Sequence, residues 1–119
     1  MTSALTRIKL DSLEHVSSGK VREVYGCVQD LLLVASDRIS AFDVVFDQGI
    51  PHKGRVLTQL AAFWFGKTSN IVANHMVTVD FDMMPPEVRV CPELEGRTTL
   101  CRKAEVLPVE CVVRGYLEG

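Results

Sequence analysis

The chain has 119 residues, 47% of them hydrophobic and 24% charged, with a formal net charge of -2. These values are typical of a single globular domain, and they argue against a nucleic-acid or membrane surface as the main partner. No apolar run reaches the length of a membrane span, and the first residues lack the apolar core of a signal peptide, so we expect neither.

The first part of the chain is expected to form strands joined by tight turns. Residues 8–13 alternate loosely between apolar and polar side chains, which predicts a first strand. A Ser-Ser-Gly turn then leads into a second strand, in which Lys20 and Arg22 would share one face. Gly19 permits a tight turn, so the two cations could hold a polyphosphate, although a solvated hairpin edge is the plainer interpretation. The stretch matches neither a Walker A loop nor the GxGxxG pattern.

A buried strand followed by a polar cluster is the most informative stretch of the chain. Residues 26–30 predict a hairpin turn, and the apolar run from Leu31 to Ala35 predicts a buried strand. Two carboxylates, two hydroxyls and a guanidinium follow within the eight residues from Ser36 to Asp43. Polar residues at the end of a strand often form a ligand site, but Ser and Asp also cap ordinary turns. On the residues alone, both interpretations stay open.

The clearest helix is expected from Arg55 to about Ile71, after a loop at residues 47–54 that contains two glycines and a proline. We expect its apolar and aromatic stripe to pack in the core rather than to bind a ligand. The stripe recurs at helical spacing and consists of Val56, Leu57, Leu60, Ala61, Trp64 and Phe65.

The last third of the chain returns to strands. Alternation at residues 76–81 predicts a short strand, and Pro86 suits the first position of a short helix after it. Residues 97–107 and 109–116 are strand-like runs, which form either one interrupted strand or two. Glu110 and Arg114 would share a face of the second run, where a structural ion pair is their plainest role.

Together these elements predict an α+β domain with a mainly antiparallel sheet and one main helix. The cysteines form no CxxC pair and no histidine stands at zinc-finger spacing, so we expect reduced, mostly structural thiols in a cytoplasmic protein. The cysteines are Cys27, Cys91, Cys101 and Cys111.

Four segments together resemble the SAICAR synthetase family, the phosphoribosylaminoimidazole-succinocarboxamide synthases of purine biosynthesis. The segments are 19–25 (GKVREVY), 35–43 (ASDRISAFD), 53–60 (KGRVLTQL) and 107–119 (LPVECVVRGYLEG). Each segment alone is a modest signal, but the four run in the family's order and span nearly the whole chain. The resemblance is therefore specific, and it supplies what composition and spacing do not.

The resemblance implies a fold and a domain boundary. Residues 1–119 would form the N-terminal ATP-binding lobe of the family, which is similar to the small lobe of protein kinases and to ATP-grasp enzymes. The family's enzymes are much longer, and their motif continues beyond Gly119 into a serine. We therefore expect the chain to stop before a C-terminal lobe, which in the family carries acidic and lysine residues near a magnesium site.

The resemblance also implies an activity. The family's enzymes are ATP-dependent carbon-nitrogen ligases that join carboxyaminoimidazole ribonucleotide to L-aspartate, giving SAICAR, ADP and phosphate through an acyl phosphate. ATP and Mg²⁺ are the implied cofactors, and both substrates are small molecules. The enzyme would be cytoplasmic, without a nucleic-acid or membrane partner, and a homo-oligomer is compatible with it. Residues 1–119 alone are expected to be inactive.

Site residues carry over from the family by matching positions. Gly19, Lys20 and Arg22 would hold the ATP phosphates. The backbone of Glu105, Val106 and Leu107 would face adenine.

A second group of residues maps near the ribonucleotide substrate, and it contains Ser40, Asp43 and Arg114. Arg114 suits a phosphate or a carboxylate because its guanidinium donates two parallel hydrogen bonds. Asp43 and Glu110 are the candidates for the catalytic set, with Asp43 orienting a substrate group or contacting an ion rather than acting as the general base. No metal ligand is assigned within the chain.

Two other function classes compete with the ligase. A non-catalytic nucleotide-binding module would keep only half of the family's fold, and it would bind nucleotide without forming product. A protein-kinase-like phosphotransferase would need a Gly-rich loop, a VAIK lysine and an HRD loop. None of these motifs is present, which disfavours the kinase.

Overall fold

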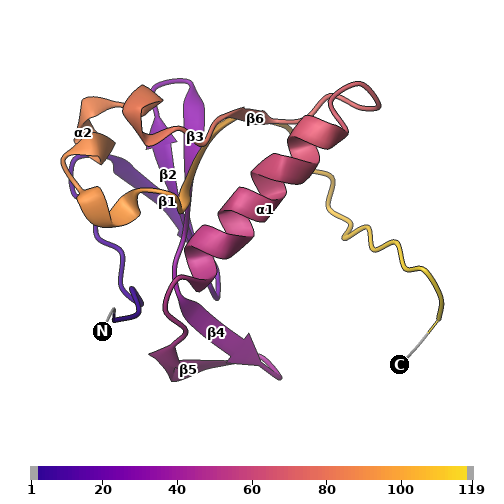
Figure 1. Ribbon diagram of the computed structural model, residues 1–119, viewed down its shortest axis with the longest axis horizontal. Coiled ribbons are helices and arrows are strands. Elements are labelled where there is room, and N and C mark those ends of the chain that lie inside the picture. Colours follow the sequence, from indigo (N-terminus) through magenta and orange to yellow (C-terminus); the bar gives the residue numbers. More distant parts are fainter. Residues whose placement is uncertain (1–2, 118–119) are drawn as a thin grey trace.

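The computed structural model describes residues 3–117, which form an α+β domain, as predicted (Figure 1). Its strands are β1 (Glu14–Ser18), β2 (Arg22–Cys27), β3 (Asp30–Ala35), β4 (Arg38–Ala41), β5 (Val44–Gly49), β6 (Met76–Thr78) and β7 (Thr98–Arg102). Its helices are α1 (Lys53–Lys67) and α2 (Pro86–Arg89), with short 3₁₀ turns η1 (Phe81–Met83) and η2 (Pro92–Leu94). Within residues 3–117, no helix has both the length and the hydropathy needed to cross a membrane.

The main sheet has five strands in the order β1-β2-β3-β7-β6, and every pairing in it is antiparallel. The apolar run predicted as a buried strand is β3, the middle strand of this sheet. Its side chains alternate, so that Leu32 and Val34 are fully buried on one face while Leu33 and Ala35 lie on the other. The predicted hairpin turn is also confirmed, because Cys27 pairs with Asp30 across a two-residue loop.

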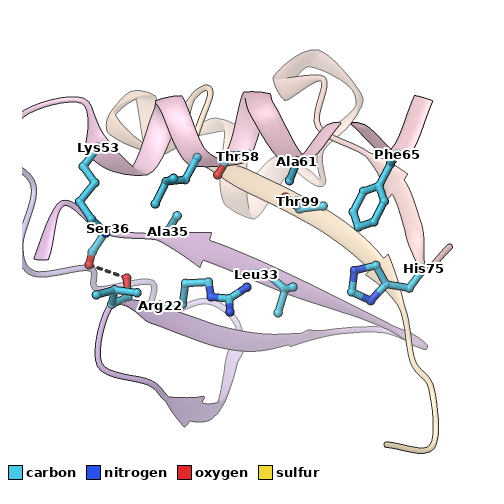
Figure 2. A pocket seen from close by; sticks show the side chains of 12 residues that line it. Arg22, Leu33, Ala35, Ser36, Lys53, Thr58, Ala61, Phe65, His75 and Thr99 are labelled. Carbon is cyan, nitrogen blue, oxygen red and sulfur yellow. Dashed lines mark hydrogen bonds between the residues drawn. The ribbon is translucent and has the colours of Figure 1, made fainter. Parts of the chain in front are cut away.

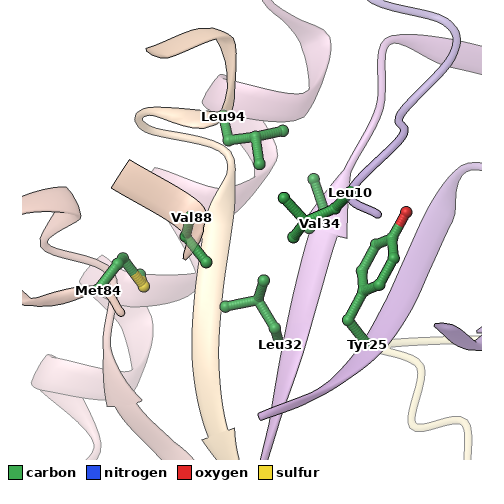
Figure 3. Close-up of a cluster of buried hydrophobic side chains, with 7 residues drawn as sticks. All are labelled: Leu10, Tyr25, Leu32, Val34, Met84, Val88 and Leu94. Carbon is green, nitrogen blue, oxygen red and sulfur yellow. The ribbon is translucent and has the colours of Figure 1, made fainter. Parts of the chain in front are cut away.

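The hydrophobic core lies on the face of the sheet away from α1 (Figure 3). The segment from η1 to η2 covers this face, with the short helix that was expected at Pro86 in its middle. The strand predicted at residues 8–13 does not form, and β1 begins only at Glu14. The N-terminal segment instead packs Leu10 into the core as part of an irregular backbone. The core residues are Leu10, Tyr25, Leu32, Val34, Met84, Val88 and Leu94.

Helix α1 crosses the opposite face of the sheet (Figure 1). It ends at Lys67, four residues before the predicted end, and the C-cap residue Thr68 donates both its backbone N–H and its hydroxyl to the carbonyl of Trp64. Only Gly54 and Thr58 of this helix are buried. The expectation that its apolar stripe packs in the core is wrong, since four of the six predicted side chains are 48–59% exposed: Val56, Leu57, Leu60 and Trp64.

The polar cluster after β3 resolves into a hairpin and a buried carboxylate. Strand β4 pairs with β5 across a two-residue turn, in which Phe42 and Asp43 both have positive φ (52° and 64°). Two left-handed residues give the turn that matches the twist of paired strands. Strand β5 then continues to Gly49, so the loop predicted at 47–54 is shorter than expected.

The C-terminal segment leaves the sheet after β7. The strand predicted at 97–107 is only five residues long, and the strand predicted at 109–116 does not form. Arg102, the last residue of β7, pairs with Asp30, the first residue of β3, and residues 103–117 pair with no strand in the described part of the chain. They extend outward with exposed side chains (Figure 1). The last two residues of the family motif, 118 and 119, lie outside the described residues.

Candidate functional site

A cavity of about 260 Å³ lies between α1 and the sheet (Figure 2). The alternation of β3 creates its floor, because Leu33 and Ala35 face α1 while their neighbours face the core. Thr99 of β7 pairs with Leu33 and extends the same floor. The apolar walls are formed by Val21, Leu33, Ala35, Leu57, Ala61 and Phe65. Such a mostly apolar pocket with a few polar groups is the usual form of a small-molecule site.

Two cations lie in this cavity on opposite sides. Arg22 comes from β2 beneath it, opposite Ala35 in the strand register, and Lys53 reaches in from the first residue of α1 (Figure 2). Among residues 3–117, neither side chain forms an ion pair with a carboxylate. At the far end, the rings of Phe65 and His75 meet edge to face at 5.8 Å. The cavity therefore offers an apolar interior with uncompensated positive charge near one end.

Asp37 lies at the base of α1, next to the cavity, and is only 1% exposed. Its carboxylate accepts hydrogen bonds from the guanidinium of Arg97 at 2.8 and 3.2 Å. It also accepts from the backbone N–H of Leu5 at 2.8 Å and of Gly54 at 2.9 Å. Burial acts to raise the pKa of Asp37, but these bonds and the charge of Arg97 outweigh it and lower the pKa to about 2. Asp37 is therefore a charged hub that joins three distant segments.

The start of α1 depends on this hub. His52 precedes the helix in a left-handed conformation (φ 69°), and its side chain gives no capping hydrogen bond. The carboxylate of Asp37 takes the place of an N-cap side chain by accepting the N–H of Gly54. A Cβ on Gly54 would lie 2.8 Å from both Arg97 Nη1 and the carbonyl oxygen of Ser36. Only glycine fits there, so the helix begins at a fixed place beside β3.

A second hydrogen-bonded cluster holds the Gly19 turn. The N–H of Gly19 donates to the carbonyl of Arg22 at 2.7 Å, which confirms the predicted tight turn. Arg38 donates to the carbonyl of Lys20 at 3.0 Å and to Glu23 at 2.7 Å. Burial acts to raise the pKa of Glu23, but hydrogen bonds from Ser18, Arg38 and His15 lower it overall. The Arg38 side chain thus holds the Gly19 turn in place through these hydrogen bonds.

The two cations predicted to hold phosphates are separated. Strand β2 begins at Arg22, so Lys20 belongs to the turn and not to the strand face that the two residues were expected to share. Lys20 lines a neighbouring open pocket beside Gly19, whereas Arg22 lines the cavity under α1. The side chain of Lys20 instead forms an ion pair with Asp43 at the tip of the β4–β5 hairpin. Two predicted site residues from different groups are therefore brought together.

The other predicted residues lie away from the cavity. Ser40 is half-buried in β4, opposite Val45. The remaining five residues lie in the exposed segment 103–117, and none of them lines the cavity: Glu105, Val106, Leu107, Glu110 and Arg114. The functional roles of all these residues stay predictions.

The sequence reasoning missed several residues that build the site. Asp37 was part of the polar cluster, and Lys53 was part of a recognised motif, but neither carried a pattern that assigned it a role. Arg97 is 60 residues from Asp37, and no sequence signal joins them. Between residues 3 and 117, no cluster of three or more His, Cys, Asp or Glu side chains could hold a metal ion. All four cysteines are free, as expected.

Comparisons with known proteins find one family throughout. The family model described as SAICAR synthetase matches residues 15–119. The phosphoribosylaminoimidazole-succinocarboxamide synthase of Syntrophotalea carbinolica is 55% identical over 109 residues, covering 91% of this chain and 37% of that protein. The enzyme of the same name from Thermodesulfovibrio yellowstonii is 48% identical over 120 residues, covering 100% of this chain and 41% of that protein.

Solved structures give the same result. A structure titled SAICAR synthase superposes with a TM-score of 0.87 at 42% identity, covering 97% of this chain and 42% of that one. The SAICAR synthase of Saccharomyces cerevisiae complexed with SAICAR superposes with a TM-score of 0.83, also at 42% identity and with the same coverage. The chain thus spans well under half the length of the curated relatives that it matches.

Proposed function

The chain belongs to the SAICAR synthetase family, and on this premise we propose that residues 1–119 form its N-terminal ATP-binding lobe. The complete enzyme would condense carboxyaminoimidazole ribonucleotide with L-aspartate, cleaving ATP to ADP and phosphate. It would act in the cytoplasm on small molecules, without a nucleic-acid or membrane partner, and a homo-oligomer is compatible with this. The likeness to the small lobe of kinases and to ATP-grasp enzymes is part of the same proposal.

The observation that carries the proposal is the cavity between α1 and the sheet. Its apolar walls suit the faces of a planar base, and Arg22 and Lys53, which pair with no carboxylate within residues 3–117, suit phosphate oxygens. The hydrogen-bonded Gly19 turn lies just before the same β2 strand, and its backbone groups and the Lys20 side chain line a neighbouring open pocket, where in this proposal they would meet the outer phosphates.

The chemistry proposed for this lobe is mainly positioning and charge neutralisation. The ribonucleotide carboxylate would attack the terminal phosphate of ATP, and the aspartate amine would then displace phosphate from the acyl phosphate. Phosphoryl transfer gains most of its rate from aligned groups and from cations near the transferring oxygens. Arg22 and Lys20 would supply cations, with Lys20 exchanging its present partner Asp43 for phosphate.

The exposed segment 103–117 and the β4–β5 hairpin would supply the remaining contacts. In this proposal the backbone at 105–107, which does not line the cavity in the present structure, would come to face adenine, and Ser40 with Arg114 would hold the ribonucleotide. Asp43 and Glu110 would complete the catalytic set. Mg²⁺ belongs to the family's expected chemistry, but residues 3–117 offer no cluster of metal ligands.

A non-catalytic nucleotide-binding module is the second candidate, because the chain matches only 37–41% of the length of its relatives. A chimera separates the two. Its first 119 residues would be this chain, followed by the remaining part of the Syntrophotalea carbinolica enzyme. The ligase proposal expects ADP release that depends on both ribonucleotide and aspartate, followed by a coupled assay. A folded chimera that binds ATP but shows no aspartate-dependent ADP release would favour the module.

A further inference from the structure

We propose that Lys53 is a phosphate-binding residue of the cavity, and that Asp37 is the positioning residue that holds it there through the first turn of α1. This proposal rests on the nucleotide-binding function above. It adds a ligand contact and a supporting residue that neither the sequence pattern nor the family match assigned.

Two side chains give the cavity a positive charge. Lys53 and Arg22 reach it from α1 and from β2, and among the described residues neither has a carboxylate partner. The surfaces between them are mostly apolar, and few polar groups are present to screen the charge. An anion that fits between two such cations gains charge-assisted hydrogen bonds from both sides. A phosphate group of a nucleotide has the charge and the acceptor geometry for this place.

Lys53 occupies an unfavourable position in its helix. A lysine at the first residue of a helix stands where the helix dipole disfavours positive charge. The first turn of α1 carries no acidic side chain of its own, and the Asp37 carboxylate at its start is already paired with Arg97. Lys67, in the last turn of the same helix, stands where the dipole favours a cation, and it lies 5.6 Å from the centre of the Phe63 ring, away from the cavity. The unfavourable placement of Lys53 is explained when an anion neutralises it.

Hydrogen bonding to Asp37 fixes the backbone beside Lys53. The N–H of the next residue, Gly54, donates to Asp37 Oδ1 at 2.9 Å in a buried bond. Asp37 is itself held by Arg97 and by the N–H of Leu5. The missing Cβ of Gly54 lets the helix start approach the end of β3. Asp37 thus acts on Lys53 through one peptide unit without lining the cavity.

The test uses the 119-residue chain and NMR titrations with three probes: ATP, adenosine and ribose 5-phosphate. This method detects even weak binding, because a bound ligand changes the chemical shifts of individual backbone amide signals. We expect ATP to shift the signals of Lys53, Gly54 and Arg22. We expect Lys53→Met to weaken ATP binding about tenfold, which is the loss of one charged hydrogen bond, and to leave adenosine binding unchanged.

A matched control lies on the same helix. Lys67→Met removes the same charge from the far end of α1 and is expected to bind ATP as the unchanged chain does. Asp37→Asn tests the positioning role: it should weaken ATP binding while adenosine binding remains. Combining Asp37→Asn with Lys53→Met should cause no further loss, because both changes remove the same contact. A merely structural role of Asp37 would weaken both ligands alike.

The outcomes separate this inference from the function on which it rests. If Lys53→Met binds ATP normally while Arg22→Met weakens it, the Lys53 assignment is overturned and the nucleotide site stands. If ribose 5-phosphate binding depends on Lys53 and ATP binding does not, the residue serves the ribonucleotide and the assignment to ATP is wrong. If the unchanged chain shows no amide shifts with ATP at millimolar concentrations, both proposals fail together.

Discussion

Asp37 and Arg97 are 60 residues apart in the sequence and form a buried ion pair, with Arg97 Nη1 2.8 Å from Asp37 Oδ1. The pair joins the end of β3 to the start of β7, and the same carboxylate holds the first turn of α1. A buried charge is tolerated where it is paired and hydrogen-bonded, as the Asp37 carboxylate is here. The geometry of the cavity wall and the stability of the domain therefore depend on the same few bonds.

The first prediction concerns removal of one charge from this pair. Asp37→Asn should lower the free energy of unfolding by about 3 kcal/mol, because the guanidinium of Arg97 would be left buried without its counter-ion. Urea unfolding followed by circular dichroism measures this. Asp43→Asn is the matched control, since its exposed pairing with Lys20 is expected to contribute less than about 1 kcal/mol. Equal unfolding midpoints for the two variants would contradict the prediction.

The second prediction is a pH dependence of stability. The pKa of Asp37 is lowered from 3.8 to about 2 in the folded chain. A group with a lowered folded pKa stabilises the fold above its unfolded pKa, and this contribution disappears as the pH falls through the folded value. The free-energy difference between the unchanged chain and Asp37→Asn should therefore shrink between about pH 4 and pH 2. A difference that stays constant over this range would show that the charge of Asp37 is not the cause.

The third prediction compares two glycines of α1. Gly54→Ala should destabilise the chain by about 1–3 kcal/mol, since its Cβ would lie 2.8 Å from Arg97 Nη1 and from the Ser36 carbonyl. Gly66→Ala should instead stabilise it by about 0.5–1 kcal/mol, because no atom lies within 4 Å of the added Cβ and alanine favours the helix. Thermal unfolding of both variants checks the pair, and destabilisation of similar size in both would contradict this account.

The fourth prediction addresses the two predicted phosphate contacts in the chimera with the Syntrophotalea carbinolica sequence. Arg22→Ala and Lys20→Ala should each raise the apparent Michaelis constant for ATP more than that for the ribonucleotide. The reason is that Arg22 lines the cavity and Lys20 borders the Gly19 turn. Steady-state kinetics with each substrate varied in turn gives the comparison. Unchanged constants for ATP in both variants would remove these residues from the nucleotide site.

The sequence was sufficient where a local pattern decides the structure. The strand at Leu31–Ala35 follows from its run of apolar residues, and the turn before it follows from the short polar break between two strand-like segments. Both were predicted correctly. The strands predicted at 8–13 and 109–116 failed because a strand forms only where a partner strand is available, and a local pattern does not contain the partner. Residues 8–13 pack Leu10 into the core with an irregular backbone, and residues 109–116 extend away from the sheet.

The polar cluster after β3 could not be interpreted from the residues alone for a similar reason. Its members divide between two roles, with Asp37 buried in an ion pair and Asp43 exposed at a hairpin tip. That division depends on Arg97, which the pairing of β7 with β3 places beside Asp37. Likewise, the helical spacing in α1 shows that one face is apolar, but it does not indicate what covers that face.

The apolar face of α1 contains Trp64, which is the only tryptophan of the chain and is 59% exposed. Its ring meets Phe63 edge to face at 5.1 Å, and neither residue lines the cavity between α1 and the sheet. The intrinsic fluorescence of the protein therefore reports on this one surface. Excited selectively, the chain should emit at the long wavelength of a hydrated indole and should be quenched readily by acrylamide. Any polypeptide that settles on α1 would shift this emission to shorter wavelength without an added label.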